Sequence, residues 1–388
     1  MGIEKRTWKN ADGGRGTAWR VTIGRGKDRE TKTFDRKRDA DDYFANAKLN
    51  KRRGLHLDPN RTPTVAEAGK AWIKICIANK LEPTTVDAYQ NHLDFHICPY
   101  IGEHKLGALT VAIVRKWQDD LRAAGRSADM VRRCTGDLGA LLAEALERGQ
   151  VAQNVVRLLR PRKRTTEKRA KRKLVVGVDI PLPSEIDSIL GAAGDDRVLF
   201  LVFIRCGLRS SELRGLRWAD VDLDKSTLHV RQRADRYNEI GRPKSDAGDR
   251  SIPLPPGTVK ALREWKERAP KSEYVFANGA GNLENRGNIV TRKWWPLQVR
   301  AGVSMSTDEV DEKGKPIMVA KYSGLHALRH YFASWCINPP PLGLGLPAKA
   351  VQERLGHSSI TMTMDTYGHL FPRGDDSVLL AAAEGKFG

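Results

Sequence analysis

The stretch RPRKRTTEKRAKRK, residues 160–173, divides the chain into parts that must fold separately. Nine of its fourteen residues are basic: Arg160, Arg162, Lys163, Arg164, Lys168, Arg169, Lys171, Arg172 and Lys173. So many like charges cannot contribute to a hydrophobic core, which predicts a linker over residues 161–180. We favour the interpretation that these side chains lie along nucleic-acid phosphates, but a solvated tether and a nuclear-localisation signal are alternatives.

The charge of the whole chain supports a polyanionic partner. The 388 residues contain 67 Lys and Arg against 47 Asp and Glu, which gives a net charge of +20. Such an excess is informative about partners rather than fold, and nucleic acid is the commonest partner of this kind. A basic protein that is merely soluble is the alternative. We expect binding to double-stranded DNA that weakens steeply with salt.

Membrane insertion and secretion are not expected. No apolar run approaches the roughly 18–20 residues of a membrane span, and the N-terminal MGIEKRTWKN has no apolar segment typical of a signal peptide. The five cysteines are scattered without CxxC spacing, which argues against a disulfide framework and a zinc site. We therefore expect a cytoplasmic protein with reduced thiols and no membrane partner.

Three folded domains are predicted around the linker. Residues 1–60 contain segments that alternate apolar and polar residues and favour three strands, followed by a helix; this basic unit is a candidate DNA-binding module or a solvated sheet without a partner. Residues 61–160 have apolar side chains at helical spacing and are predicted to form four helices. Residues 181–388 mix helices and strands. The predicted fold class is multidomain, mainly α with small β-sheets (α+β).

Two segments of the last domain carry side chains suited to phosphate chemistry. In CGLRSSELRGLRWADVD, Arg209 precedes Glu212 by three residues, and this carboxylate can hold the guanidinium rigid for paired phosphate oxygens. An ordinary surface ion pair is the alternative. In GLHALRHYFASW, His326, Arg329 and His330 share one face of a predicted helix. No carboxylate ligand pattern accompanies these histidines, so metal binding is not expected.

A third segment, LGHSSITMTMDTYGHL, places Tyr367 among small and polar residues, ten positions after His357. A tyrosine that packs a core usually has apolar neighbours at regular spacing, so these polar surroundings argue against a core position for Tyr367. Lys244, in GRPKSDAGDRSIPL, ends a strand beside a flexible turn. Taken alone, it is more typical of a solvated hairpin lysine.

Six residues follow one another in an order that resembles the tyrosine recombinases, the integrase family of phages and mobile elements: Arg209, Lys244, His326, Arg329, His357 and Tyr367. The motifs GLRSSELRGLRWADVD, LHALRHYFAS and LGHSSITMTMDTYGHL each match a family motif, and the resemblance covers most of residues 174–388. More weakly, residues 61–160 resemble the family's helical, SAM-like core-binding domain, and residues 1–60 its arm-type DNA-binding domain. Tyr367 follows His357 by ten positions, where several members have nine, a difference that a shift of one residue in the preceding turn would absorb.

The resemblance implies a site-specific recombinase that cleaves DNA without metal, ATP or another cofactor. Tyr367 would attack a phosphodiester, form a 3′-phosphotyrosine and release a 5′-hydroxyl, and a 5′-hydroxyl from another strand would later reseal the bond. Arg209 and Arg329 would neutralise the charge that develops on the non-bridging oxygens.

The remaining motif residues would handle protons and support the site. His326 is implied as general base or phosphate donor, and His357 as a donor to the phosphate. Lys244 would protonate the departing 5′-oxygen. Glu212 and His330 are expected to support these residues rather than act directly.

The same resemblance implies partners and leaves two other functions open. Strand exchange implies a homo-tetramer on DNA, with core-type and arm-type sites and a possible accessory DNA-bending or excision factor. A type IB topoisomerase-like enzyme would nick and reseal without exchange, but the arm-like N-terminus argues against it. A DNA-binding regulator with a vestigial recombinase site is disfavoured because every catalytic position carries the expected residue type.

Overall fold

The structure is a computed structural model that describes residues 2–9, 15–24, 30–52, 61–160, 173–243, 245–372 and 384. The chain divides into two compact units, residues 1–165 and 166–388, and each is described by itself. Of the nine basic linker residues, Arg160 and Lys173 fall within the described ranges. The other seven, and also Lys244, lie outside them, so the phosphate contacts of the linker stay a prediction.

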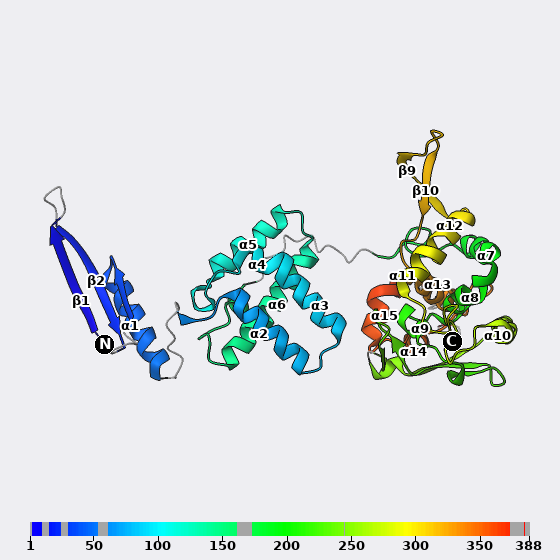
Figure 1. Ribbon diagram of the computed structural model, residues 1–388, viewed down its shortest axis with the longest axis horizontal. Helices are drawn as coiled ribbons and strands as arrows, with labels where there is room; N and C mark the ends of the chain where they lie inside the picture. Colours follow the sequence, from blue (N-terminus) through cyan, green and yellow to red (C-terminus); the bar gives the residue numbers. More distant parts are fainter. Residues whose placement is uncertain are drawn as a thin grey trace. The chain divides into compact units, whose positions relative to one another are not determined.

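The chain begins with a small sheet and a helix (Figure 1). The strands pair antiparallel in the order β1-β2-β3, and α1 packs against them; the elements are β1 (Gly2–Lys9), β2 (Arg15–Ile23), β3 (Glu30–Phe34) and α1 (Lys37–Arg52). The core of this part is a small cluster around Val21 and Ile23. Lysine ammonium groups lie over partly buried aromatic rings, as Lys5 and Lys37 do over Trp19.

The rest of the first unit is helical. Its helices bury a continuous apolar core; they are α2 (Val65–Ala78), α3 (Pro83–His92), α4 (Cys98–Ile101), α5 (Val111–Ala123) and α6 (Ala128–Glu147), with a π-helical turn at Leu93–Ile97 that joins α3 to α4. Thr64 and Glu67 form a capping box at the start of α2, with hydrogen bonds of 3.1 and 2.7 Å. Such caps satisfy the backbone N–H groups that a helix leaves unpaired at its N-terminus.

The second unit mixes short sheets with helices. Its first half contains α7 (Pro183–Ala192), α8 (Arg197–Cys206), α9 (Ser210–Arg214), β4 (Val221–Asp222), β5 (Thr227–Val230), β6 (Arg233–Ala234), β7 (Ile240–Gly241), β8 (Arg250–Pro253) and α10 (Pro256–Arg268). Its second half contains α11 (Arg286–Asn288), α12 (Trp295–Arg300), β9 (Ser304–Val310), β10 (Pro316–Ala320), α13 (His326–Ile337), α14 (Ala348–Leu355) and α15 (Ile360–Tyr367). All sheets are antiparallel, in the orders β4-β5-β8, β6-β7 and β9-β10. The predicted fold class, mainly α with small sheets, is confirmed.

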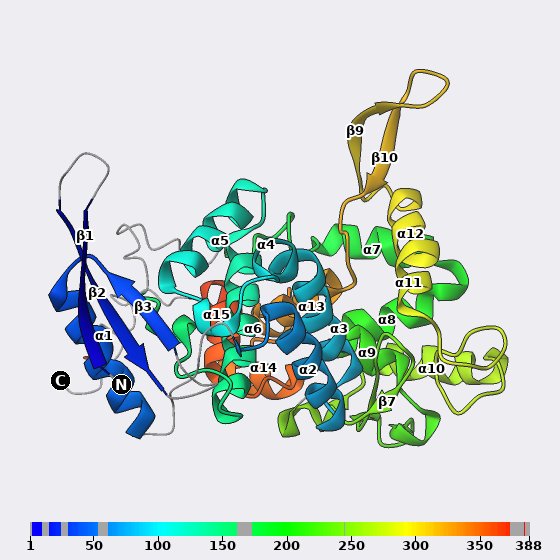
Figure 2. The ribbon, with the colours of Figure 1, turned by 60° about the vertical axis from the view of Figure 1, so that its left-hand side comes forward.

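Helix α8 is the centre of the second unit. All of its side chains except those of Arg197 and Arg205 at its two ends are apolar and buried. The helix packs against α7, α10 and α13 (Figure 2). It ends at Gly207, which adopts φ +60°. A side chain there would overlap the ring of Phe332, so only glycine fits this turn. The turn directs the chain into the Arg209 segment.

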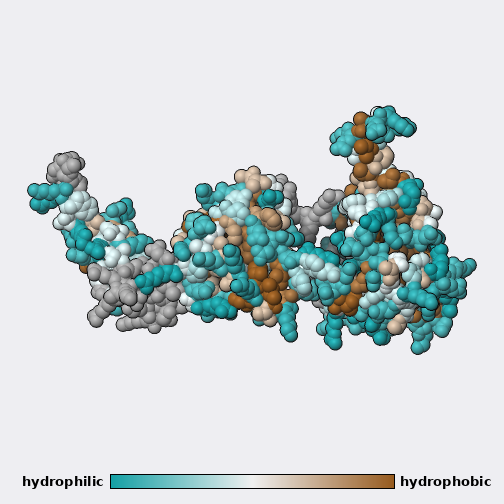
Figure 3. All heavy atoms as spheres, viewed as in Figure 1, coloured by the Kyte–Doolittle hydropathy of each residue, from teal (hydrophilic) through white to brown (hydrophobic). Residues whose placement is uncertain are grey.

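The hairpin β9–β10 projects from the second unit and exposes apolar side chains, seen in brown in Figure 3. Met305, Val310 and Met318 are the most exposed of them. Among the described residues, no helix combines the length and apolar character needed to cross a membrane.

Candidate active site

Five of the six predicted catalytic residues converge in the second unit. They come from three separate stretches of the chain. Arg209 lies at the start of α9, and His326 and Arg329 lie in α13. His357 lies in the turn after α14, and Tyr367 ends α15. Lys244, the sixth, lies outside the described residues. The hydrogen bonds and ring contacts below join these stretches into one cluster.

Three arginines meet the C-terminus of α14. Arg250 Nε donates to the main-chain oxygen of Arg354 at 2.8 Å. Arg329 donates to the main-chain oxygen of Leu355 at 2.5 Å. Arg209 donates to the main-chain oxygen of Gly356 at 3.1 Å. The last carbonyls of a helix have no partner within the helix, and cations are favoured at this end. The end of α14 therefore fixes three guanidinium groups that come from distant parts of the chain.

Gly356 makes this convergence possible. It adopts φ +63°, the left-handed conformation that commonly ends a helix. A Cβ atom added there would lie 2.8 Å from both the Ala247 oxygen and an Arg250 nitrogen. The glycine of the LGH motif is thus required by backbone conformation and by the close approach of Arg250.

Glu212 pairs with two arginines at once. Its carboxylate accepts from Arg209 Nη1 at 2.6 Å and from Arg250 at 2.9 and 3.3 Å, and one of its oxygens also accepts the Arg209 backbone N–H. Burial opposes ionisation of this carboxyl, but the charge of Arg250 and then that of Arg209 hold its pKa below the usual value. The Arg209–Glu212 contact expected from their spacing is present, whereas Arg250 was not anticipated.

Arg329 is buried and Arg209 is not. Arg329 is 2% exposed and donates to the Gly207 oxygen at 2.6 Å as well as to Leu355. Burial and then the charge of Arg209 lower the pKa of Arg329 to about 9, so it remains a cation at neutral pH. The side chain of Arg209 is 33% exposed, which leaves its guanidinium open to a ligand from solvent.

Tyr367 ends α15 and is buried, contrary to the expectation from its polar neighbours in sequence. The helix begins after its cap residue, Ser359, and runs to Tyr367, so the ten-residue spacing is taken up by a short turn and two helical turns. The phenol oxygen lies 2.8 Å from His330 Nδ1, and the ring is parallel to that of His357 with centroids 6.3 Å apart. Burial raises the pKa of Tyr367 to about 12, against the opposing charges of nearby arginines.

The histidines of the cluster are held neutral. Burial, followed by neighbouring positive charges, lowers the pKa of His326, His330 and His357 to about 4. The rings of His326 and His330 meet edge to face at 4.6 Å, and His357 Nδ1 lies 2.9 Å from Thr363 Oγ1. His330, predicted only to support the site, is the histidine in contact with the phenol.

The hairpin before Lys244 is anchored by Arg214, which is buried at the end of α9. Its guanidinium donates to the main-chain oxygens of Asp235 at 2.7 Å and Glu284 at 2.6 Å, and to the side chain of Asn238. The bonds to Asp235 and Asn238 fix the turn between β6 and β7, and the bond to Glu284 ties α9 to the segment before α11.

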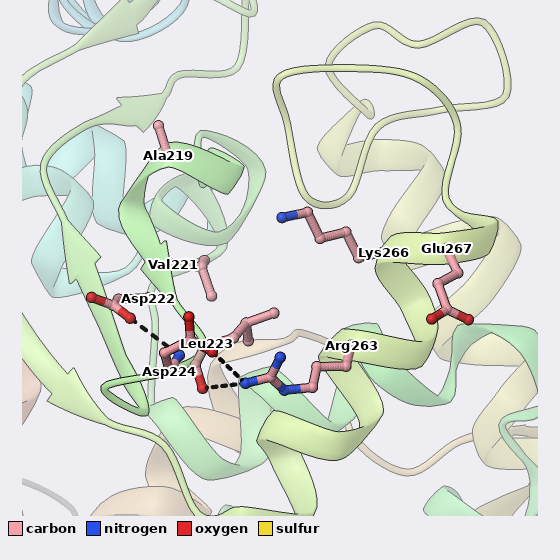
Figure 4. Close-up of a pocket in the computed structure, with 8 residues that line it drawn as sticks. All are labelled: Ala219, Val221, Asp222, Leu223, Asp224, Arg263, Lys266 and Glu267. Atoms are coloured by element: carbon pink, nitrogen blue, oxygen red, sulfur yellow. Dashed lines mark hydrogen bonds and ion pairs between the residues drawn. The ribbon is translucent and has the colours of Figure 1, made fainter.

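A surface pocket elsewhere in the unit does not include the cluster. It lies between the β4 region and α10, and its lining residues are Ala219, Val221, Asp222, Leu223, Asp224, Arg263, Lys266 and Glu267 (Figure 4). None of the predicted catalytic residues is among them. Within the part of the chain that the structure describes, no group of three or more His, Cys, Asp or Glu side chains is arranged to hold a metal ion.

The neutral state of His357 predicts a dependence of stability on pH. The residue is 7% exposed and its pKa is lowered to about 4, against about 6.5 in an unfolded chain. Between these values the unfolded state binds a proton that the folded state does not, so the free energy of unfolding falls as the pH is lowered from 6.5 toward 4. At pH 5 this loss is on the order of 2 kcal/mol.

The prediction is checked by urea unfolding at pH 7 and pH 5. We expect the wild-type protein to lose more stability between the two pH values than His357→Gln, which has no group titrating in that range at this position. Equal losses in the two proteins would show that His357 is not held neutral by the fold.

Comparisons with known proteins cover most of the chain. The profile of the phage integrase family matches residues 182–373, and that of the phage integrase N-terminal SAM-like domain matches residues 64–122. The tyrosine recombinase XerC of Xanthomonas axonopodis pv. citri is 30% identical over 255 residues, which cover 63% of this chain and 69% of that protein. The chain belongs to the tyrosine recombinase family. This recombinase is therefore an enzyme of site-specific DNA strand cleavage and rejoining.

Other relatives cover more of the recombinase. A XerC-like tyrosine recombinase of Caldanaerobacter subterraneus subsp. tengcongensis is 24% identical over 355 residues, 83% of each chain. The integrase of the Tn1549 transposon, solved with transposon end DNA, superposes with a TM-score of 0.62 at 18% identity, over 84% of this chain and 100% of that one. A lambda integrase dimer bound to a core site gives 0.56 at 17% identity, over 92% and 93%. At these identities the solved structures establish the shared fold.

Proposed function

We propose that this recombinase integrates, and in the reverse reaction excises, the DNA of a phage or another mobile element through a 3′-phosphotyrosine intermediate. The observation that carries the proposal is the contact of the Tyr367 phenol with His330 inside a cluster that holds Arg209 and Arg329. A phenol beside a proton acceptor and two cations is suited to attack on a phosphodiester.

Arg209 and Arg329 are proposed to stabilise the charge that develops on the phosphate. Both guanidinium groups are oriented by main-chain oxygens, so little reorganisation is needed when the phosphate arrives. Arg209 is the more exposed of the two and would make the first contact. His326 and His357 are proposed as neutral hydrogen-bond donors to the phosphate.

His330 is proposed as the group that takes the proton of Tyr367. With a neutral ring, the phenol O–H donates and Nδ1 accepts. Full transfer before attack would be strongly unfavourable, since the pKa is about 4 for His330 and about 12 for Tyr367. The proton would therefore leave as the new bond between the phenol oxygen and phosphorus forms. This assigns to His330 the base role expected of His326.

Lys244 is proposed as the general acid of the same step. The bond from phosphorus to the 5′-oxygen breaks as the phosphotyrosine bond forms, and the leaving oxygen takes a proton from the Lys244 ammonium group. The resealing reaction runs through the same positions in reverse, with the free 5′-hydroxyl as nucleophile.

The DNA partners follow from the charge and the domain resemblance. Residues 61–160 and 181–388 would bind the core-type site, residues 1–60 an arm-type site, and the basic linker would follow the phosphates between them. The solved lambda integrase tetramer bound to a Holliday junction, which has a TM-score of 0.56 to this chain, supports a homo-tetramer on DNA. An accessory DNA-bending or excision factor, and action in the cytoplasm of a bacterial host, are part of the proposal.

A plasmid assay tests the proposed function. A supercoiled plasmid carries the DNA that flanks the recombinase gene as one candidate site and the joined ends of the element as the second. Exchange between the two sites is the expected result. Relaxation of the plasmid without exchange would indicate a type IB topoisomerase-like enzyme, and binding with neither reaction would indicate a regulator.

A further inference from the structure

Arg250 is a buried cation to which the proposed mechanism gives no role. It begins β8 and is 9% exposed. Its guanidinium donates to both carboxylate oxygens of Glu212, to the Gly248 oxygen at 3.0 Å and, through Nε, to the Arg354 oxygen at 2.8 Å. A buried cation with this many partners is costly to desolvate, so its retention calls for a reason beyond packing.

The reason lies in the charge that Glu212 carries. This carboxylate touches Arg209, the proposed phosphate ligand, at 2.6 Å. If Arg209 were its sole counter-ion, the pair would be close to neutral and would attract a phosphate weakly. The bidentate contact of Arg250 supplies a second positive charge to the same carboxylate.

We propose that Arg250 is a positioning residue that neutralises Glu212 and so leaves Arg209 as an uncompensated cation facing the scissile phosphate. Glu212 then orients Arg209 without cancelling its charge. The inference rests on the proposed function, in that Arg209 contacts the phosphate.

Two observations support this division of roles. Arg250 is buried and donates from two guanidinium nitrogens to the two carboxylate oxygens, whereas Arg209 donates from one guanidinium nitrogen to Glu212 and its side chain is one-third exposed. The charge of Arg250 also contributes more than that of Arg209 to keeping the Glu212 pKa low. Both indicate that Arg250 is the principal counter-ion of Glu212.

The test compares an ordinary phosphodiester with a methylphosphonate at the cleavage position. The methylphosphonate lacks one negatively charged non-bridging oxygen, so its cleavage needs less positive charge in the site. We expect Arg250→Met to form covalent complex about 10- to 100-fold more slowly than wild type on the phosphodiester, below the loss typical of a direct donor. On the methylphosphonate, the variant should approach the wild-type rate.

Two more variants separate charge from structure. Glu212→Gln combined with Arg250→Met removes the buried ion pair as a whole and restores the net charge, so it should fold and cleave the phosphodiester faster than Arg250→Met alone. Arg250→Lys keeps the charge without the fork and should fall between wild type and Arg250→Met. If the double variant is no faster than Arg250→Met and the methylphosphonate gives no recovery, Arg250 is structural and the inference is wrong.

Matched controls make the outcomes distinct. Arg263→Met makes the same chemical change at an arginine that is hydrogen-bonded to Asp224 beside the pocket of Figure 4, and should cleave both substrates at wild-type rates. Arg209→Ala tests the proposed function itself. If Arg209 contacts the phosphate, the cleavage rate of this variant should also approach the wild-type rate on the methylphosphonate. Recovery of Arg209→Ala without recovery of Arg250→Met rejects the role of Arg250 alone; failure of both rejects the phosphate-binding role of Arg209 as well.

Discussion

Tyr367→Phe is expected to abolish the covalent protein–DNA complex while leaving the protein folded. Phenylalanine keeps the buried ring but lacks the oxygen that would bond to phosphorus. The loss of the contact with His330 should cost only about 1 kcal/mol of stability. The complex is measured on a denaturing gel with labelled duplex DNA that carries a nick just to the 3′ side of the cleavage position. The short released fragment, which carries the free 5′-hydroxyl, then diffuses away and traps the covalent intermediate.

Tyr322→Phe is the matched control for this experiment. Tyr322 is also buried in the second unit, and its hydroxyl donates to Glu185 at 2.7 Å, outside the cluster. This variant should form covalent complex as the wild type does. A complex that persisted in Tyr367→Phe would mean that another residue is the nucleophile.

Arg209→Ala is expected to slow cleavage about 10²- to 10³-fold, the usual loss when one preorganised charge donor is removed from a transition state. The fold should survive, because the side chain is partly exposed and Glu212 keeps Arg250 as its partner. The rate of covalent complex formation is measured with enzyme in excess over DNA, alongside DNA affinity at the same salt concentration. Affinity should change far less than the rate, since one contact among many is lost.

A second arginine serves as reference for this prediction. Arg205 lies at the end of α8 and its guanidinium lies over the ring of Trp335, so it is not one of the residues proposed to contact the phosphate, and Arg205→Ala should retain its cleavage rate. A cleavage rate for Arg209→Ala close to that of Arg205→Ala would remove Arg209 from the proposed catalytic set.

Local sequence patterns were sufficient for the fold class and for one contact of the site. Alternating segments and helical spacing gave the small sheets and the helices, and the three-residue separation of Arg209 and Glu212 predicted their ion pair, present at 2.6 Å. Such predictions succeed because the residues concerned are neighbours on one element. The convergence of the three motif segments came from the family resemblance, since no local pattern relates them.

Contacts between distant segments could not be predicted. Arg250 lies 38 residues from Glu212 and 104 from Arg354, so its role depends on how β8 packs against α9 and α14. One signal was available: alternation along β8 puts Arg250 on the same face as the buried Ile252, and a cation on a buried face needs a partner.

The burial of Tyr367 was missed for a related reason. Its neighbours in sequence are polar, but its neighbours in space are the rings of His330 and His357 and the core around Phe332 and Leu355. Sequence context describes the first set and not the second. The polar residues next to the tyrosine therefore gave the wrong expectation for its exposure.

The arginines at the end of α14 have a consequence for how this enzyme tolerates mutation. Their main-chain acceptors at Gly207, Arg354, Leu355 and Gly356 are peptide oxygens, which every amino acid supplies. A substitution at Leu355 changes a side chain in the core but leaves its carbonyl in place. A single substitution can therefore replace one of the arginines or disturb the backbone at either glycine. It cannot remove one of these main-chain acceptors.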